Sequence, residues 1–118
     1  MDERRILAVT EHELPDGLRL IELHGEFDVG SAGLVRSALA GADAAGCPRV
    51  IVDLSDVPLI DSTALAVLVV AHKRLRRTGR ELVVVLPDQG MTTKFQIAGL
   101  DRFFSIASTR EEALGRAV

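Results

Sequence analysis

The sequence predicts an α/β fold in which a mostly parallel β-sheet, with one antiparallel edge strand, is covered by helices. The length of 118 residues fits a single domain, 1–118. Residues 50–54 and 82–86 are almost continuously apolar, which is typical of strands that a parallel sheet buries on both faces. Segments with helical spacing of apolar residues alternate with these runs, so helices are expected to connect parallel strands.

An antiparallel pair of strands is predicted at the start of the chain. Residues 7–10 and 18–23 are two short strand candidates. The Pro-Asp-Gly segment at 15–17 is a turn signal, and a connection this short joins antiparallel neighbours. This pair supplies the antiparallel edge of the predicted sheet.

A helix is expected to begin near residue 31, where the apolar positions change to a spacing of three and four residues. Ser31 or Asp28 could cap its first turn, because both side chains can accept hydrogen bonds from free backbone amides. Gly41 and Gly46 are expected to break the helix near its end.

The second half of the chain is predicted from similar start and stop signals. The expected elements are a strand at 50–54, a helix from Asp61 to about Thr78 that Gly79 stops, a strand at 81–86 closed by Pro87, a helix at 89–98 followed by Gly99, a strand at 103–107, and a last helix that Ser108 caps. Glu111 and Glu112 lie in the first turn of that helix, where acidic side chains interact favourably with the helix dipole.

The helix predicted at 61–78 leaves two alternatives open. Apolar residues lie on most of its sides, which indicates either burial on two faces or one face presented to a protein partner. Its last turns carry the basic run 73–80, which is either a solvated helix end or a contact for an acidic partner surface.

Composition excludes several classes of partner and compartment. A net charge of −3 gives no field that would gather a polyanion, so we expect no direct contact with nucleic acid. Cys47 is the only cysteine, so no internal disulfide is possible. The start MDERRILAV has no signal-peptide pattern, and the longest apolar run, 64–71, is far shorter than the ~20 residues that cross a bilayer. We therefore expect a soluble, cytoplasmic protein without membrane contact, whose oligomeric state the sequence does not determine.

No catalytic or metal-binding constellation can be assembled. His12, His24 and His72 have neither the spacing of a helical metal pair nor a neighbouring cysteine, so each is expected to be solvated or hydrogen-bonded. Segment 25–31 has the glycines of a phosphate-binding loop without its lysine. We expect no enzyme activity, no cofactor and no metal. A hydrolase that uses Ser62 is a minor alternative, because the G-x-S-x-G turn of such enzymes is absent.

Several segments together resemble the STAS family. Residues 50–55 form a buried strand, and Asp-Ser-Thr-Ala-Leu at 61–65 resembles the family's D-S-[ST]-[GA]-L at the start of a helix. Gly-Glu-Phe-Asp at 25–28 resembles its G-E-[LF]-D after the second strand. Segments 78–84 and 99–114 resemble its helix-to-strand turn and its closing segment. The resemblance spans almost the whole chain, and the STAS-like fold that it implies agrees with the order of elements predicted above.

The resemblance implies an anti-sigma-factor antagonist, which is a phosphorylation-switched binding protein. In such proteins the serine after the motif aspartate is phosphorylated by the partner, which is both a serine kinase and the anti-sigma factor. Ser62 corresponds to this phosphoacceptor, and the unphosphorylated protein would bind the kinase and free a sigma factor. The predicted partner-binding residues are Asp28, Asp61, Ser62, Thr63, Ala64 and Val67. Ala64 replaces the glycine of many members, which we expect to matter little.

A second hypothesis comes from the same resemblance. STAS domains also occur in transporters and in large stress-sensing assemblies, some without a phosphorylatable residue. The chain would then be an adaptor, and the segment 61–63 would be a helix cap and nothing more.

Overall fold

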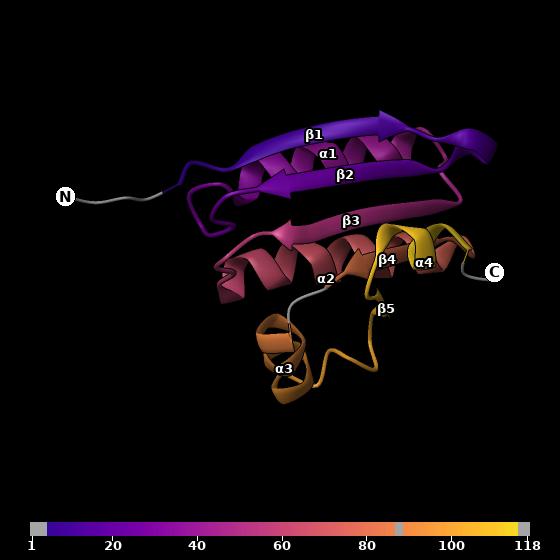
Figure 1. The fold of residues 1–118 in the computed structure, drawn as a ribbon. Helices are drawn as coiled ribbons and strands as arrows, with labels where there is room; N and C mark the ends of the chain where they lie inside the picture. The colour runs from indigo at the N-terminus through magenta and orange to yellow at the C-terminus, as the bar shows by residue number, and fades with distance from the viewer. Residues whose placement is uncertain (1–4, 87–88, 116–118) are drawn as a thin grey trace.

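A computed structural model describes residues 5–86 and 89–115 of the chain and contains one five-stranded sheet with the order β1-β2-β3-β4-β5 (Figure 1). The strands are β1 (Ala8–Glu13), β2 (Arg19–His24), β3 (Arg49–Asp56), β4 (Glu81–Val85) and β5 (Ser105–Ala107). β1 pairs with β2 in the antiparallel direction, and all other neighbours are parallel. The predicted mostly parallel sheet with one antiparallel edge strand is confirmed.

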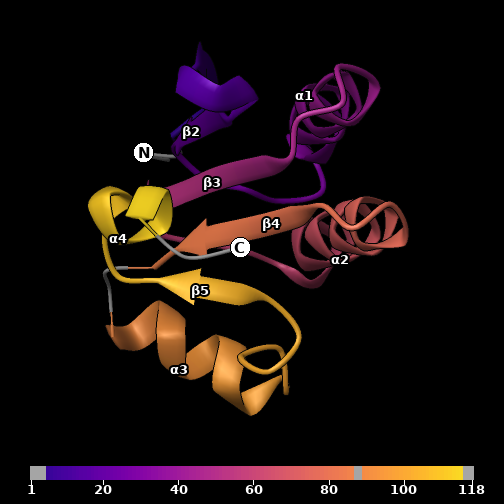
Figure 2. The same ribbon diagram turned by 90° about the vertical axis from the view of Figure 1, so that its right-hand side faces the viewer.

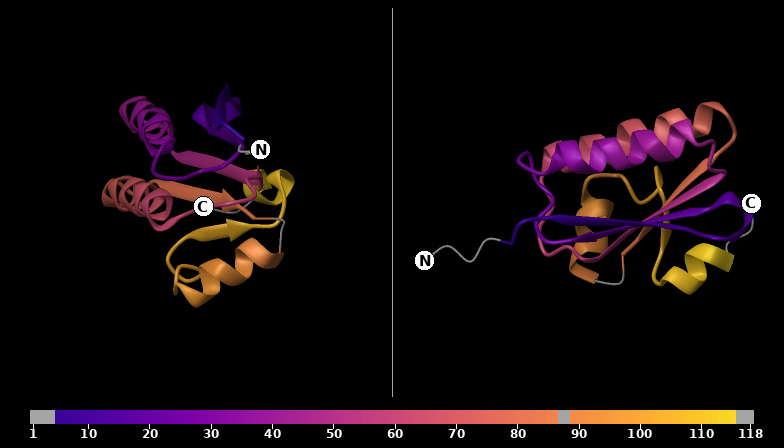
Figure 3. Two further views of the ribbon diagram at one scale, coloured as in Figure 1. Left: turned by 90° about the vertical axis from the view of Figure 1, so that its left-hand side faces the viewer. Right: turned by 90° about the horizontal axis from the view of Figure 1, so that it is seen from above.

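Helices cover both faces of this sheet, but unequally. The four helices of the described residues are α1 (Ala32–Ala44), α2 (Ser62–Arg77), α3 (Gln89–Ile97) and α4 (Arg110–Gly115). A short 3₁₀ turn, η1 (Pro15–Gly17), connects β1 and β2. α1 and α2 lie side by side on one face, and the short α4 lies on the opposite face (Figure 2). α3 lies beyond β5, at the edge of the sheet (Figure 3).

Both faces of the central strands are buried, as the apolar runs predict. Val50 and Val52 of β3 pack in the larger core beneath α1 and α2, whereas Ile51 packs in the smaller core beneath α4. β4 alternates in the same way, with Val83 in the smaller core and Val84 in the larger one. The absence of polar alternation in these strands is therefore a consequence of helices on both sides.

Element ends differ from the prediction at several points. α1 continues through Gly41, and the first left-handed residue after it is Gly46, with φ of +75°. The final helix is capped by Thr109 rather than Ser108, because Thr109 Oγ1 accepts a hydrogen bond from the Glu112 amide at 3.0 Å. The first strand is longer than predicted, and the last is shorter. Pro87, the predicted end of the fourth strand, lies outside the described residues.

Most of the apolar surface of α2 is used within the fold. The helix buries Ala64, Val67, Leu68, His72 and Leu75. Val70, on a different side, is 53% exposed. Burial therefore accounts for most of the apolar character of α2, and one strip of the helix still faces solvent. In the part of the chain that the structure describes, no helix is both long and apolar enough to cross a bilayer.

Candidate functional site

Two loops meet at the C-terminal end of the parallel strands, where β2 and β3 both finish. Phe27, after β2, forms an isolated parallel bridge with Ile60, after β3. The Phe27 amide donates to the Leu59 carbonyl at 3.0 Å, and the Asp61 amide donates to the Phe27 carbonyl at 3.3 Å. The loop that carries Asp28 is thereby fastened to the loop that leads into α2.

Gly25 starts the first of these loops in a conformation that requires glycine. Its φ is +118°, and a Cβ atom placed there would lie 2.8 Å from the carbonyl oxygen of Ile6. A side chain would therefore suffer both backbone strain and a clash with backbone. The glycine of the 25–28 motif thus permits the close approach of the segment before β1.

Asp61 is the N-cap of α2 and also connects the two loops. Its Oδ1 accepts a hydrogen bond from the Ala64 amide at 2.9 Å, which satisfies one of the free amides of the first turn. Its Oδ2 accepts from the Val29 amide at 3.0 Å. Both carboxylate oxygens are therefore committed to the fold.

Asp28 is a buried residue that shapes the loop before α1. Its Oδ1 accepts from the amides of Gly30 at 3.0 Å and Ser31 at 3.2 Å. Ser31 Oγ in turn accepts from the Asp28 amide at 3.0 Å and donates to the Glu26 carbonyl. The sequence suggested Ser31 or Asp28 as a cap of α1. The structure uses both to hold the loop ahead of the helix, and Ser31 makes no capping bond to α1 itself.

Ser62 differs from Asp61 and Asp28 because its side chain is exposed and makes no hydrogen bond to the described residues. It is the first residue of α2, and its hydroxyl has no hydrogen-bond partner within residues 5–86 and 89–115. Thr63 is half-buried, Ala64 is fully buried and Val67 is 6% exposed. Of the predicted partner-binding residues, Ser62 thus offers a free polar group, while Ala64 anchors the helix in the core.

Exposed apolar residues at this end of the parallel strands were not recognised from the sequence. Val29 is 70% exposed, Leu34 in the first turn of α1 is 56% exposed, and Leu59 is 46% exposed. Val29 and Leu59 lie on the two loops that meet beside Ser62. Val29 and Leu59 are isolated apolar residues in loops and form no periodic pattern, so only their placement at the Ser62 end of the strands distinguishes them from scattered surface residues.

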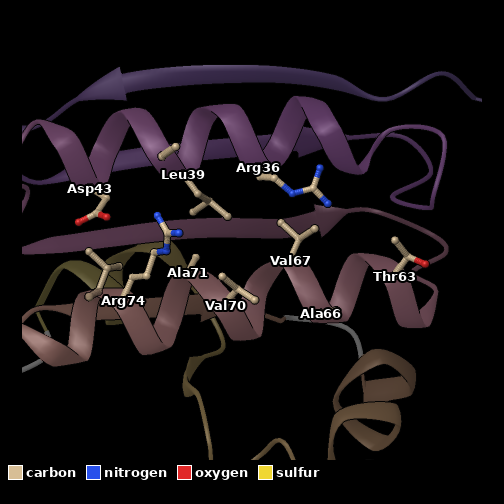
Figure 4. Close-up of a pocket in the computed structure, with 11 residues that line it drawn as sticks. Arg36, Leu39, Asp43, Thr63, Ala66, Val67, Val70, Ala71 and Arg74 are labelled. Carbon is tan, nitrogen blue, oxygen red and sulfur yellow. The ribbon is translucent and has the colours of Figure 1, made fainter.

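A groove of about 350 Å³ lies between α1 and α2 and extends from the Ser62 end of α2 towards its C-terminus. Figure 4 shows side chains from both helices that point into this space. Its lining residues are Arg36, Leu39, Ala40, Asp43, Thr63, Ala66, Val67, Val70, Ala71, Arg74 and Leu75. Thr63 places one end of the groove next to Ser62.

Ion pairs stabilise the strand ends near this edge. Asp56 at the end of β3 pairs with His24 Nδ1 at 2.9 Å and accepts from Arg5 Nη2 at 3.0 Å. The hydrogen bond to His24, followed by that to Arg5, lowers the pKa of the Asp56 carboxyl below its ordinary value. Among the described residues there is no group of three or more His, Cys, Asp or Glu that could hold a metal ion.

The three histidines have different surroundings. His12 Nε2 pairs with Glu22 at 2.5 Å, and His24 pairs with Asp56, as expected. For His72 the expectation of a solvated or hydrogen-bonded ring is not met at Nδ1. It is 4% exposed and packs against the rings of Phe103 and Phe104, and its Nδ1 has no partner among the described residues.

Comparison with known proteins identifies the fold family. The family model of the STAS domain matches residues 10–113. The chain belongs to the STAS domain family. This STAS domain is 31% identical over 98 residues to BtrV of Bordetella bronchiseptica, whose name describes a candidate anti-sigma factor antagonist. The match covers 83% of the chain and 84% of BtrV.

Solved structures agree with this assignment. An anti-sigma factor antagonist from Mycobacterium paratuberculosis superposes with a TM-score of 0.78 at 25% identity, with 92% of each chain covered. SpoIIAA of Bacillus, in its phosphorylated form, superposes with a TM-score of 0.71 at 22% identity over 91% of this STAS domain and 96% of SpoIIAA, which shows the shared fold. The resemblance to STAS-domain anti-sigma factor antagonists, predicted from the motifs at 25–28 and 61–65, is confirmed.

Proposed function

We propose that the chain is an anti-sigma factor antagonist that binds an anti-sigma kinase while Ser62 is unphosphorylated, and so frees a sigma factor. The observation that carries this proposal is the difference between the side chains of Asp61, which is hydrogen-bonded, and Ser62, which is exposed. The Asp61 side chain caps α2 and links the two loops, whereas the Ser62 hydroxyl is exposed and has no hydrogen-bond partner among the described residues. A serine that served only as a helix cap would accept a hydrogen bond from the first turn, as Asp61 does.

The surroundings of Ser62 support a protein partner. The apolar side chains of Val29, Leu34 and Leu59 are exposed at the edge of the sheet where Ser62 lies. Burying such residues is the usual source of binding free energy at a protein interface. A phosphoacceptor beside these side chains would lie within the contact, where an added charge has its greatest effect.

Phosphorylation would act on this interface by charge. A phosphate adds about −1.5 to −2 charges and meets the free amides at the N-terminus of α2, so the fold should be retained. The partner surface would then have to desolvate or oppose that charge. A loss of about 3 kcal/mol of binding free energy weakens an interaction more than a hundredfold.

The comparisons support the proposal at two levels. BtrV and the mycobacterial protein carry the name of anti-sigma factor antagonist and are at least 25% identical to this chain. SpoIIAA shares the fold and has a phosphorylated form, so the fold is compatible with a bound phosphate. In this role the chain is a cytoplasmic kinase substrate rather than an enzyme, and any nucleotide belongs to the kinase.

Affinity capture with matched baits tests the proposal. Wild-type protein, Ser62→Ala and Ser62→Asp are immobilised, exposed to lysate of the source organism, and the bound proteins are identified by mass spectrometry. We expect an ATP-binding anti-sigma kinase on wild type and Ser62→Ala, and its loss on Ser62→Asp. Ser108→Asp is the control, because it adds the same charge at an exposed position that leads into α4 on the opposite face of the sheet.

The alternative adaptor role predicts a different result. All four baits would then capture the same transporter or scaffold proteins, with no kinase among them. Incubating the captured kinase with ATP and wild-type protein, and mapping phosphate to Ser62 against Ser62→Ala, tests the phosphoacceptor directly. Phosphate on another residue would contradict the assignment of Ser62.

A further inference from the structure

The groove between α1 and α2 combines apolar walls with two positive charges that have no partner in the described part of the chain. Val67, Val70 and Ala71 of α2 face Leu39 of α1 across it (Figure 4). Val70 is more than half exposed on its rim. The apolar residues of the lining that are open to solvent are Val70 and Ala66 of α2 and Ala40 of α1, whereas Leu39 and Val67 are buried, at 5% and 6% exposed.

The charges in the groove are not balanced within the described part of the chain. Arg36 extends from α1 and Arg74 from α2 into the space between the helices (Figure 4). Neither has a hydrogen-bond or ion-pair partner within residues 5–86 and 89–115. The acidic residue of the lining, Asp43, is already paired with the Arg80 guanidinium, which also donates to the Asp43 carbonyl at 3.1 Å.

The length of the groove fits a short helix. Thr63 and Leu75 mark the extent of the lining on α2; they are twelve residues apart, which is about 18 Å at ~1.5 Å per residue. A helix of about three turns could lie along this length and pack against both α1 and α2.

We propose that this groove receives an amphipathic helix of the anti-sigma partner, whose apolar face covers Ala66 and Val70 and whose acidic residues pair with Arg36 and Arg74. The assignment of the helix to that partner rests on the proposed function. Continuity supports it, since Thr63 both lines the groove and follows Ser62. The phosphoacceptor and the groove would then form one binding surface, with the groove supplying affinity and Ser62 supplying the switch.

The experiment uses two stapled helical peptides of about 14 residues as probes, because unconstrained helices of this length are only marginally stable. Both have the same leucine and alanine face, and one carries glutamates where the other carries lysines. Each is titrated to about 1 mM into ¹⁵N-labelled protein, and amide shift changes give the site and the affinity. We expect the glutamate peptide to bind at least tenfold more tightly than the lysine peptide and to shift the amides of Leu39, Ala66, Val70 and Ala71.

Two variants of equal charge separate the groove from the general field of the protein. Arg36→Glu with Arg74→Glu reverses the charges in the groove, and Lys73→Glu with Arg77→Glu reverses the same number outside its lining. The first pair should weaken binding of the glutamate peptide about tenfold or more, and the second pair should have little effect. Circular dichroism of each variant verifies that the fold is retained.

Other outcomes overturn the proposal. These are no binding of the glutamate peptide, equal binding of both peptides, shift changes confined to other surfaces, or equal weakening by the two variant pairs. Because the peptides need no kinase, such a failure leaves the Ser62 capture result intact. A failed capture, in turn, rejects the proposed function without deciding what the groove binds.

Discussion

The two ends of the parallel strands use polar side chains in opposite ways. At the end where β3 and β4 begin, here called the Arg49 end, charged groups tie elements together. The buried Arg49 pairs with Glu81 at 3.0 Å and donates to the carbonyls of Ala113 and Leu114, and Arg80 pairs with Asp43. At the other end, here called the Ser62 end, the Ser62 hydroxyl and three large apolar side chains face solvent.

This difference suggests that the Arg49 end stabilises the fold, whereas the Ser62 end serves recognition. The Arg49 end connects β3, β4, α1, α4 and the turn after α2. Its polar groups are therefore hydrogen-bonded within the fold. The Ser62 end is braced mainly through Asp61 and Asp28, which leaves neighbouring groups available. Substitutions at the Arg49 end should therefore change the free energy of unfolding, and those at Ser62 should change binding.

The largest effect on stability is expected at the Arg49 end. Arg49→Met keeps an apolar stem of similar length but removes the donors to Glu81 and to the α4 carbonyls. We expect the free energy of unfolding to fall by about 3 kcal/mol, because one partner of a buried ion pair is removed. Urea denaturation followed by circular dichroism measures it. Adding Glu81→Leu should restore part of the loss. An unchanged urea midpoint for Arg49→Met would show that the polar contacts of the Arg49 end do not stabilise the fold.

An intermediate effect is expected from two adjacent residues at the Ser62 end. Asp61→Ala removes the N-cap of α2 and the bond to the Val29 amide, so it should cost about 1–2 kcal/mol of unfolding free energy. Ser62→Ala should change that free energy by no more than about 0.5 kcal/mol, because the serine side chain is exposed and makes no hydrogen bond with any residue that the structure describes. The same urea experiment compares the two variants. Equal losses would mean that Ser62 also supports the fold.

A smaller effect, of opposite sign to that of Asp61→Ala, is expected at His72, a buried side chain with no ion-pair partner among the described residues. His72→Leu should raise the free energy of unfolding at pH 7 by about 1 kcal/mol, because it removes an unpartnered buried nitrogen. A decrease in stability would show that the ring makes a polar contact that the packing against Phe103 and Phe104 does not reveal.

The pH dependence of His72 provides a second readout. Burial, followed by the nearby charge of Arg76, lowers the pKa of His72 below its ordinary value of 6.5. Below about pH 6.5 the unfolded chain therefore binds more protons at this residue than the folded chain, and stability falls with falling pH until the folded pKa is reached. Urea midpoints at several pH values should show this slope in wild type and a smaller slope in His72→Leu.

Local sequence patterns determined the elements and the family of this protein. Apolar runs at 50–54 and 82–86 predicted buried parallel strands, because only strands covered on both faces lack polar alternation. The Asp-Ser-Thr segment at 61–63 marked both the start of α2 and the motif that carries the STAS resemblance. Gly41 misled the prediction of a helix end, since a glycine ends a helix only where the backbone turns left-handed, as it does at Gly46.

The tertiary structure decided which side chains remain available. By residue type, Asp61, Ser62 and Thr63 could each cap α2. Only the hydrogen bonds show that Asp61 accepts from both the Ala64 and the Val29 amides, while the Ser62 hydroxyl has no partner among the described residues. The exposed Val29, Leu34 and Leu59, and the unpaired Arg36 and Arg74, come from segments with no common periodicity. Periodicity indicates which side chains share one face of a single element. A surface or groove is formed by several elements, so it exists only once the helices and loops have packed together.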